Sequence, residues 1–309
     1  MDVSIIIVNY NNFDLLTTCL ESLKKQTLNL SYEVIVVDNN STEGYVEEHL
    51  KNCPNVILIK NEKNLGYASA NNIGAKTASG KYLLILNNDV VFIENAIQKV
   101  FQFAEQQKEE VIIGCKLLNE DMSLQVSVST FPSIWNIFTE SLFMYKIFPK
   151  SRFFNKYYLN YNDIQKIIEV DVVKGAFLFC SRKTFNELKG FDERFYFYSE
   201  ETDYCYRFKQ KAGKVIYYPE TSLIHLGGAT TDKNLWFKYK NQTIAHIQWY
   251  QKCFHGVGFV IVLFSHYIGL LLRGLLYLVG GLLSMNKNLI IKSYYFFKRI
   301  FVYPKNVFN

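Results

Sequence analysis

The most constraining feature of the sequence is a short apolar run that ends abruptly in asparagine or aspartate, and this feature recurs. Three such runs are candidates for buried strands: residues 3–8, 33–37 and 82–86. Apolar residues at helical spacing accompany them, at residues 15–23 and 97–104. Strands that alternate with helices predict an α/β fold with a mostly parallel, doubly wound sheet.

The third run ends in the triplet Asn87, Asn88 and Asp89. In an open α/β sheet, ligands bind at the carboxyl ends of the strands, which is where this triplet would lie. Asn87 and Asp89 would point to the same side of an extended chain, and their oxygens suit a divalent cation that holds a diphosphate. The alternative is a plain turn, which asparagine and aspartate also favour.

The ends of the first two runs suit a nucleotide. Asn9 and Tyr10 follow the first run, and Asp38 and Asn39 follow the second. Tyr10 could stack on a base, and Asp38 could accept the imide hydrogen of a uracil or thymine. Neither a Walker A loop nor a GxGxxG motif follows the first run, which argues against a P-loop NTPase or a dinucleotide dehydrogenase.

Further candidates lie between residues 170 and 228. Residues 170–180 are predicted to form a strand, with Gly175 where a ligand comes close. Glu200 and Glu201 fall in the first turn of a predicted helix, where they either stabilise the helix dipole or supply a general base. His225 precedes a glycine pair and is either structural or part of a metal site.

The charge of the chain is concentrated near its end. Residues 1–253 contain 28 Lys and Arg and 28 Asp and Glu, whereas residues 254–309 contain six basic residues and no acidic one. The latter segment is also the most apolar, which predicts contact with a membrane surface rather than with nucleic acid. We expect helices that lie in the interface or re-enter it; an oligomer interface is the alternative.

Polar residues in this tail follow a helical pattern, and a second segment lacks one. His255, His266, Arg273 and Ser284 are separated by 11, 7 and 11 residues, which places them along one line of a helix. Four basic residues of the next helix are expected on one broad side: Lys287, Lys292, Lys298 and Arg299. Residues 131–161 hold eleven aromatic residues without a clear period, and we interpret them as an excursion over the binding face or an extra helical pair.

Taken together, the sequence resembles the family 2 glycosyltransferases, and within them the rhamnosyltransferase-like branch of bacterial surface-polysaccharide synthesis. The matching stretches are VSIIIVNYNN, VIVVDNNST, NEKNLGYASANNIG, YLLILNNDV, VKGAFLFCSRKTFNELKGFDERFYFYSEETDYCYR and YYPETSLIHLGG. The resemblance implies a GT-A catalytic domain over residues 1–253, with residues 131–168 on the acceptor side. Residues 254–309 would then be a membrane-associated helical region on the cytoplasmic face.

The resemblance also implies an activity. It is an inverting transfer from a nucleotide-diphosphate sugar, either dTDP-rhamnose or a UDP-sugar, with Mg²⁺ or Mn²⁺. The apolar, basic tail adds the expectation that the glycan acceptor is lipid-linked. By resemblance, Asp89 and His225 are metal ligands, Asn87 stands where many relatives carry Asp, and Asp38 recognises the base. Glu201 falls at the position of the catalytic base, with Glu200 as the second candidate. The residues expected around the donor are Asn9, Tyr10, Asp38, Asn39, Gly66, Asn87, Asn88 and Asp89.

Two other classes of protein remain open at this point. The chain could be a catalytically inactive GT-A module that acts as an assembly partner at the membrane, because Asn87 departs from the usual aspartate. It could also be a sugar nucleotidylyltransferase, although the Gly-rich N-terminal signature of those enzymes is absent.

Overall fold

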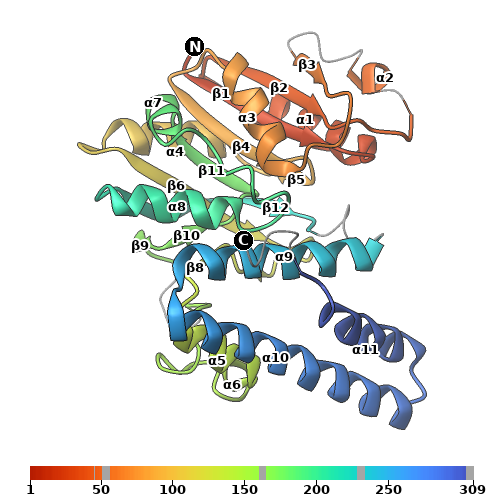
Figure 1. The fold of residues 1–309 in the computed structure, drawn as a ribbon. Coiled ribbons are helices and arrows are strands. Elements are labelled where there is room, and N and C mark those ends of the chain that lie inside the picture. The colour runs from red at the N-terminus through yellow and green to blue at the C-terminus, as the bar shows by residue number, and fades with distance from the viewer. Residues whose placement is uncertain (45, 51–55, 160–164, 228–233, 304–309) are drawn as a thin grey trace. The chain divides into compact units, whose positions relative to one another are not determined.

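The computed structural model describes residues 1–44, 46–50, 56–159, 165–227 and 234–303 (Figure 1). The chain divides into two units. The sheet unit comprises Met1–Ser129, Asp163–Tyr196 and Glu200–Thr230. The helical unit comprises Thr130–Asn162, Phe197–Ser199 and Thr231–Asn309. The extent of the catalytic domain remains a prediction.

The sheet unit is built on a sheet that has ten strands among the described residues. The main path runs β3 (Val56–Lys60), β2 (Tyr32–Asp38), β1 (Val3–Asn9), β4 (Tyr82–Asn87), β11 (Phe177–Ser181), β6 (Val111–Leu118), β12 (Lys214–His225) and β5 (Val90–Phe92). β7 (Leu124–Gln125) pairs with β6, and β9 (Ile168–Val170) pairs with β12. Strands β3, β2, β1 and β4 are parallel, as are β6 and β12. The predicted mostly parallel α/β sheet is confirmed.

Six helices are described in this unit: α1 (Phe13–Gln26), α2 (Val46–Leu50), α3 (Tyr67–Thr77), α4 (Ala96–Glu105), α7 (Arg182–Glu187) and α8 (Glu200–Gln210). α1 buries Leu16, Cys19 and Leu23, which lie on one side of the helix as their spacing predicts. α3 instead approaches the sheet closely through small residues. A Cβ atom at Gly74 would lie 2.6 Å from a methyl group of Ile6, so glycine is required there.

The prediction of a single strand over residues 170–180 is wrong. β10 (Val172–Val173) pairs with β8 (Val128–Ser129) in a separate small sheet, and β11 begins only at Phe177. The break is a local turn, because the Phe177 amide donates to the Lys174 carbonyl at 3.3 Å instead of to a neighbouring strand. Gly175 lies in this turn. After α8 the chain continues as β12, which ends at His225.

The helical unit contains α5 (Ile134–Ser141), α6 (Met144–Ile147), α9 (Leu235–Cys253), α10 (Gly256–Leu283) and α11 (Lys287–Arg299). The aromatic segment 131–161 therefore holds two helices in its described part, as the helical-pair alternative proposed. α10 has 28 residues and is the one described helix long and apolar enough to cross a membrane. An 18-residue stretch within it has a mean hydropathy of 2.0, and a third of that stretch is buried.

α10 has an inverted surface. Its buried positions are mostly small or polar, and its outward positions are large and aliphatic. The buried residues are Val262, Ser265, His266, Gly269, Leu270, Gly274 and Gly281. A Cβ atom at Gly274 would lie 2.7 Å from the ring of Phe297 in α11, so glycine permits this close packing. The predicted polar line therefore faces inward at His266, while His255 and Ser284 at its ends are exposed.

One residue of the predicted basic side of α11 is misplaced. Arg299 is only 6% exposed, whereas Lys287 is exposed. Its Nε donates to the Thr243 hydroxyl at 2.8 Å, and its guanidinium lies 5.3 Å from the ring centroid of Tyr239. These contacts draw the side chain into the unit, so Arg299 is not a surface charge.

Candidate active site

The ends of the first three predicted strands meet at one edge of the sheet. The parallel register pairs Asn9 with Asp38 and places Asn87 beside Val8. Asn88 donates through Nδ2 to Asn9 Oδ1 at 2.8 Å, and Asn9 Nδ2 lies 3.4 Å from Asp38 Oδ1. These buried hydrogen bonds join the predicted base-recognition and metal-binding ends, as expected for one ligand site.

Asp38 and Asn39 shape the loops around this edge. The Asp38 carboxylate accepts hydrogen bonds from the Ser41 amide and hydroxyl. Both ends of the Asn39 side-chain amide form hydrogen bonds within the protein. Nδ2 donates to Asn64 and to the Gly66 carbonyl, and Oδ1 accepts from Asn61 and from the Leu65 amide. Asn39 therefore orders the loop before α3. Its contact with a donor remains a prediction.

Gly66 and Tyr10 lie near Tyr196. Gly66 has φ +84°, and a Cβ atom there would lie 2.4 Å from the Tyr196 carbonyl oxygen, so only glycine fits. Tyr10 is half-buried. Burial and, after it, Tyr10 raise the pKa of Tyr196, whose hydroxyl donates to Asn64 at 2.7 Å. Tyr10 thus remains partly exposed near Tyr196, and base stacking on its ring stays a prediction.

Strand pairing places His225 next to Asp89. β12 pairs antiparallel with β5, so His225 lies opposite Val90, and the Leu226 amide donates to the Asp89 carbonyl at 2.9 Å. His225 Nε2 lies 3.2 Å from Asp89 Oδ1. The other ring nitrogen, Nδ1, lies 2.6 Å from Gln125 Oε1. The structure therefore places these two candidate ligands next to each other.

The orientation of Gln125 sets the tautomer of His225. Gln125 Nε2 donates to Asn119 Oδ1 at 2.9 Å and to the His225 carbonyl at 3.0 Å, so Oε1 must be the atom that faces the ring. Nδ1 then carries the proton, and the lone pair of Nε2 faces Asp89. Gln125 was not among the residues that the sequence motifs indicated.

This arrangement fits a divalent cation. Asp89 Oδ1 is buried and accepts no hydrogen bond from the described residues. Two acceptor atoms that face each other at 3.2 Å repel unless a proton or a metal ion lies between them. No group of three or more His, Cys, Asp or Glu side chains gathers in the part of the chain that the structure describes. The protein would therefore supply a partial ligand set, which phosphate oxygens and water can complete.

Asn87 adds to this set through Tyr67, a residue that the sequence did not identify. The Tyr67 hydroxyl lies 2.8 Å from Asn87 Oδ1 and 3.2 Å from the Gly175 carbonyl, and Asn87 Nδ2 lies 3.2 Å from His225 Nε2. If the Asn87 side-chain amide is flipped, Oδ1 faces His225 and the place where a cation would bind, and Nδ2 donates to the Tyr67 hydroxyl. The hydroxyl then donates to Gly175, so Tyr67 supports either orientation.

Glu200 and Glu201 begin α8, after two residues in left-handed backbone. Tyr198 has φ 73° and Ser199 has φ 68°, conformations that cost of order 1–3 kcal/mol each and persist only where the surroundings impose them. Burial and, after it, the charge of Glu201 raise the pKa of Glu200 well above its ordinary value. Glu200 therefore holds its proton more tightly than an ordinary glutamate, which makes it the weaker candidate for a base.

Glu201 lies on the same side as Tyr67. A Cβ atom at Gly175 would lie 3.8 Å from Glu201 Cβ and 3.8 Å from Tyr67 Cε1. Burial and then Glu200 raise the pKa of Tyr67 well above its ordinary value, which keeps its hydroxyl protonated as a donor. Tyr67 thus connects the metal position to the acidic pair. The signal in the sequence is an aromatic hydroxyl directly after Gly66 at the start of a helix.

The buried acid of Glu200 predicts a dependence of stability on pH. Its folded pKa is raised above the ordinary 4.5, so the folded state holds the proton more tightly than the unfolded state. This contribution is fully present below pH 4.5 and is lost as pH rises through the folded pKa. Glu200→Gln should remove the loss, so the variant should gain stability relative to wild type as pH rises, as measured by urea unfolding. Glu187→Gln, an exposed control, should show no such gain; an equal gain in both variants would contradict the prediction.

The family comparison and the related proteins agree with each other. The family description Glycosyl transferase family 2 matches residues 4–185. The O-antigen biosynthesis protein RfbC of Myxococcus xanthus is 29% identical over 232 residues, covering 72% of this chain and 17% of that protein. An uncharacterized glycosyltransferase of Haemophilus influenzae is 38% identical over 122 residues, covering 38% of this chain and 41% of that protein. The chain thus spans less than half the length of either relative.

The fold is also shared with solved structures. The structure of GalNAc-T7 with UDP, GalNAc and Mn²⁺ aligns with a TM-score of 0.53 at 18% identity, over 73% of this chain and 44% of that chain. At this identity the likeness concerns the fold alone, and it agrees with the GT-A architecture that the sequence motifs implied.

Proposed function

The chain belongs to glycosyl transferase family 2, and from this premise we propose that it transfers a sugar from a nucleotide-diphosphate donor to an acceptor hydroxyl in the synthesis of a surface polysaccharide. The observation that carries the proposal is the pair of facing acceptors, Asp89 Oδ1 and His225 Nε2, at the edge where β1, β2 and β4 end. The description of RfbC as an O-antigen biosynthesis protein supports the polysaccharide context.

Different residues of the candidate site serve base binding, metal binding and proton transfer. Asp38 and Tyr10 hold the base, and Asp89, His225 and Asn87 hold a Mg²⁺ or Mn²⁺ ion. When bound, the ion stabilises the negative charge of the leaving nucleoside diphosphate. Glu201 takes the proton of the acceptor hydroxyl as its oxygen bonds to the anomeric carbon, and the bond to the diphosphate breaks. One displacement from the opposite face inverts the anomeric centre and needs no covalent nucleophile.

The donor and metal belong to the proposal as well. UDP and Mn²⁺ accompany the similarly folded GalNAc-T7, which supports a UDP-sugar and Mn²⁺, and dTDP-rhamnose is the second donor. Mixing the protein with UDP-sugars and dTDP-sugars in the presence of Mn²⁺ tests the activity through release of nucleoside diphosphate. Release with one donor supports an active transferase. The absence of release with every donor, together with retained nucleotide binding, would favour the inactive assembly module.

We further propose that α10 lies in the cytoplasmic interface of a membrane and that the acceptor is lipid-linked. Its outward side presents large aliphatic and aromatic side chains to solvent, including Phe264, Leu276 and Leu283. A water-exposed apolar surface of this kind marks an interaction site. Basic residues such as Lys287 flank it, which favours the anionic cytoplasmic leaflet.

Membrane attachment is best tested by substitution. α10 packs against α5, α9 and α11 inside one unit, so deleting residues 254–309 would uncover buried side chains. Leu276 and Leu283 are 60% and 82% exposed, and burial of each is worth about 1.5–3 kcal/mol. The double change to aspartate should weaken vesicle binding about a hundredfold in flotation assays.

A matched control is available in the sheet unit. Leu28 is 57% exposed, so Leu28→Asp changes charge and apolarity at a comparable site. This variant should float with vesicles as the wild type does. If the wild type ignores vesicles and instead loses an oligomer when Leu276 and Leu283 are changed, the apolar side is an oligomer interface.

A further inference from the structure

Basic residues far outnumber acidic ones in the helical unit as a whole, and not only in residues 254–309. Its residues include 14 Lys and Arg against two acidic residues, Glu140 and Asp232. From Leu235 to Tyr303, through all of α9, α10 and α11, there is no acidic residue. The excess also extends into the interior of the unit, where a charge without a partner is costly.

Arg299 is the clearest case. It is 6% exposed, and its Nε donates to the Thr243 hydroxyl at 2.8 Å. Its guanidinium lies near the rings of Tyr239 and Phe296, at 5.3 and 5.2 Å from their centroids. The two terminal nitrogens, which carry four N–H donors, have no hydrogen-bond acceptor and no carboxylate among the described residues. Neither terminal nitrogen is among the fully buried atoms that lack a partner, so this donor fork is open to solvent.

His266 presents a second unused group nearby. It is 7% exposed, its Nδ1 lies 3.3 Å from the Tyr250 hydroxyl, and its buried Nε2 has no partner among the described residues. Burial raises the pKa of Tyr250, so its hydroxyl keeps the proton that it can donate to Nδ1. In that tautomer Nε2 carries a hydrogen with no acceptor.

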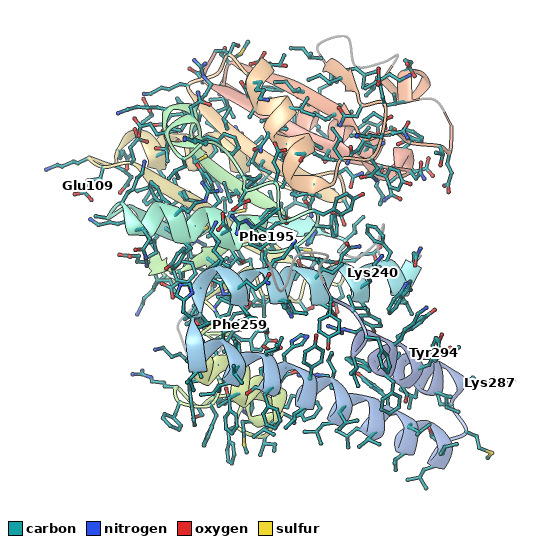
Figure 2. The ribbon with its side chains drawn as sticks, viewed as in Figure 1. Glu109, Phe195, Lys240, Phe259, Lys287 and Tyr294 are labelled. Atoms are coloured by element: carbon teal, nitrogen blue, oxygen red, sulfur yellow. The ribbon has the colours of Figure 1, made fainter. Side chains whose placement is uncertain are left out.

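The two groups belong to one cluster. Arg299 bonds to Thr243 of α9, and the ring of His266 packs against His246, which lies one turn farther along the same helix. Burial lowers the pKa of His266 well below its usual range, and the charges of His246, Arg299 and Arg273 lower it further. Figure 2 shows side chains of α9 and α10 meeting in the space between these helices. His246 in α9 is exposed and its ring centroid is 5.6 Å from that of His266, so the cluster reaches the surface.

Glu140 is the one acidic residue that the structure describes in this unit, and its charge favours the charged form of Arg299. Its carboxylate accepts from the Tyr158 hydroxyl at 3.2 Å, and only its main-chain carbonyl accepts from Arg273, at 2.9 Å. Arg273 and Arg299 form no ion pair with any carboxylate of the described residues. A guanidinium fork, a second guanidinium and an imidazole N–H together match the several acceptor oxygens of a phosphate group.

We propose that Arg299, His266 and Arg273 form a binding site for a phosphate or diphosphate group. The inference rests on the proposed function in one respect: if the acceptor is lipid-linked, its diphosphate is the natural occupant. The inverted surface of α10 supports this source, because the helix that supplies His266 and Arg273 also presents an apolar outer side that a lipid chain can follow. The site is distinct from the donor edge of the sheet, which lies in the other unit.

The test is calorimetric titration of inorganic diphosphate into the full-length protein in detergent, with EDTA present so that the metal-dependent donor site is silent. Hydrogen bonds to charged groups are worth about 1.5–3 kcal/mol, so Arg299→Gln should weaken binding about ten- to hundredfold. His266→Gln is a second variant that leaves the packing of α11 unchanged and should also weaken it. Lys298→Gln removes the same charge from the neighbouring residue, which lies over the ring of Trp236, and should bind normally.

Several outcomes would overturn the proposal. No binding of diphosphate by the wild type would do so, as would equal affinities of wild type, Arg299→Gln and His266→Gln. Equal weakening by Lys298→Gln would indicate diffuse surface charge and would also overturn it. Asp89→Ala should retain diphosphate binding while losing donor binding, so a failure of the proposed function appears in a separate measurement.

Two further arms identify the source of the group. Tighter binding of farnesyl diphosphate in phosphatidylcholine vesicles than of inorganic diphosphate supports a lipid-borne group, and equal affinity supports a soluble phosphate group at the same site. Binding to phosphatidylglycerol vesicles that depends on Arg299, without any binding of diphosphate, would overturn the diphosphate assignment in favour of an anionic membrane surface.

Discussion

Replacing Asp89 with alanine is expected to abolish Mn²⁺-dependent binding of the donor nucleotide. In the proposed metal site, Asp89 is the one carboxylate among the described residues, and its Oδ1 is buried and faces His225 Nε2 at 3.2 Å. A metal ion supplies several kcal/mol of charge stabilisation to the leaving diphosphate, so turnover should fall about a thousandfold or more. Calorimetry with UDP and with dTDP, each with and without Mn²⁺, measures the loss of binding directly.

The fold should survive this change. Asp89 is held through its main-chain carbonyl, which accepts from the Leu226 amide, and alanine retains that bond. Asp14→Ala removes an exposed carboxylate from the first turn of α1 and should leave nucleotide binding unchanged. Unaltered Mn²⁺-dependent affinity in Asp89→Ala would show that the metal is held elsewhere or is not used.

Glu201→Gln is expected to keep donor affinity and lose turnover. Loss of a general base typically costs about a hundredfold to ten-thousandfold in rate. Glu201 is the better candidate because burial and the charge of Glu201 raise the pKa of Glu200, and because Glu201 lies against Gly175, on the side of Tyr67. Donor affinity by calorimetry and single-turnover transfer separate binding from chemistry.

The neighbouring glutamate provides the matched comparison. Glu200→Gln keeps a side chain of the same size and removes the carboxyl whose pKa is raised, so it should retain most of the turnover. If Glu200→Gln is the inactive variant and Glu201→Gln remains active, the two roles are reversed. If both remain active, the base is neither member of the pair.

The sequence predicted those parts of the site that follow from strand position. Asp38 and Asp89 each lie at the end of a buried apolar run, and parallel pairing brings such ends to one edge whatever the loops do. Glu200 and Glu201 were found because they begin a helix with a clear pattern. In each case a local signal sufficed.

The missing parts depend on contacts between distant residues. Gln125 and His225 are 100 positions apart, and nothing local to either predicts that one fixes the tautomer of the other. Tyr67 is a similar case, since its hydroxyl contacts Asn87 and Gly175 from the start of α3. The break between β10 and β11 arises from a single backbone hydrogen bond that apolar periodicity does not record.

Helical periodicity also cannot tell inward from outward when the outer side is apolar. The spacing of His266 and Arg273 correctly grouped them on one line of α10, but that line faces other helices of its unit. The same ambiguity misplaced Arg299, because a basic residue among aromatic neighbours can be covered by their rings.

Because the small residues of α10 are buried and its large ones face outward, we expect its small positions to tolerate substitution least and its large positions to tolerate it most. In most helices the small exposed positions accept change and the large buried ones do not. Here Gly269, Gly274 and Gly281 leave no room for a single added carbon, whose nearest neighbours would lie between 2.7 and 2.8 Å away. The outward aliphatic residues can exchange freely with one another, provided that they remain aliphatic. Variation among natural versions of this helix should therefore be widest on its most hydrophobic side.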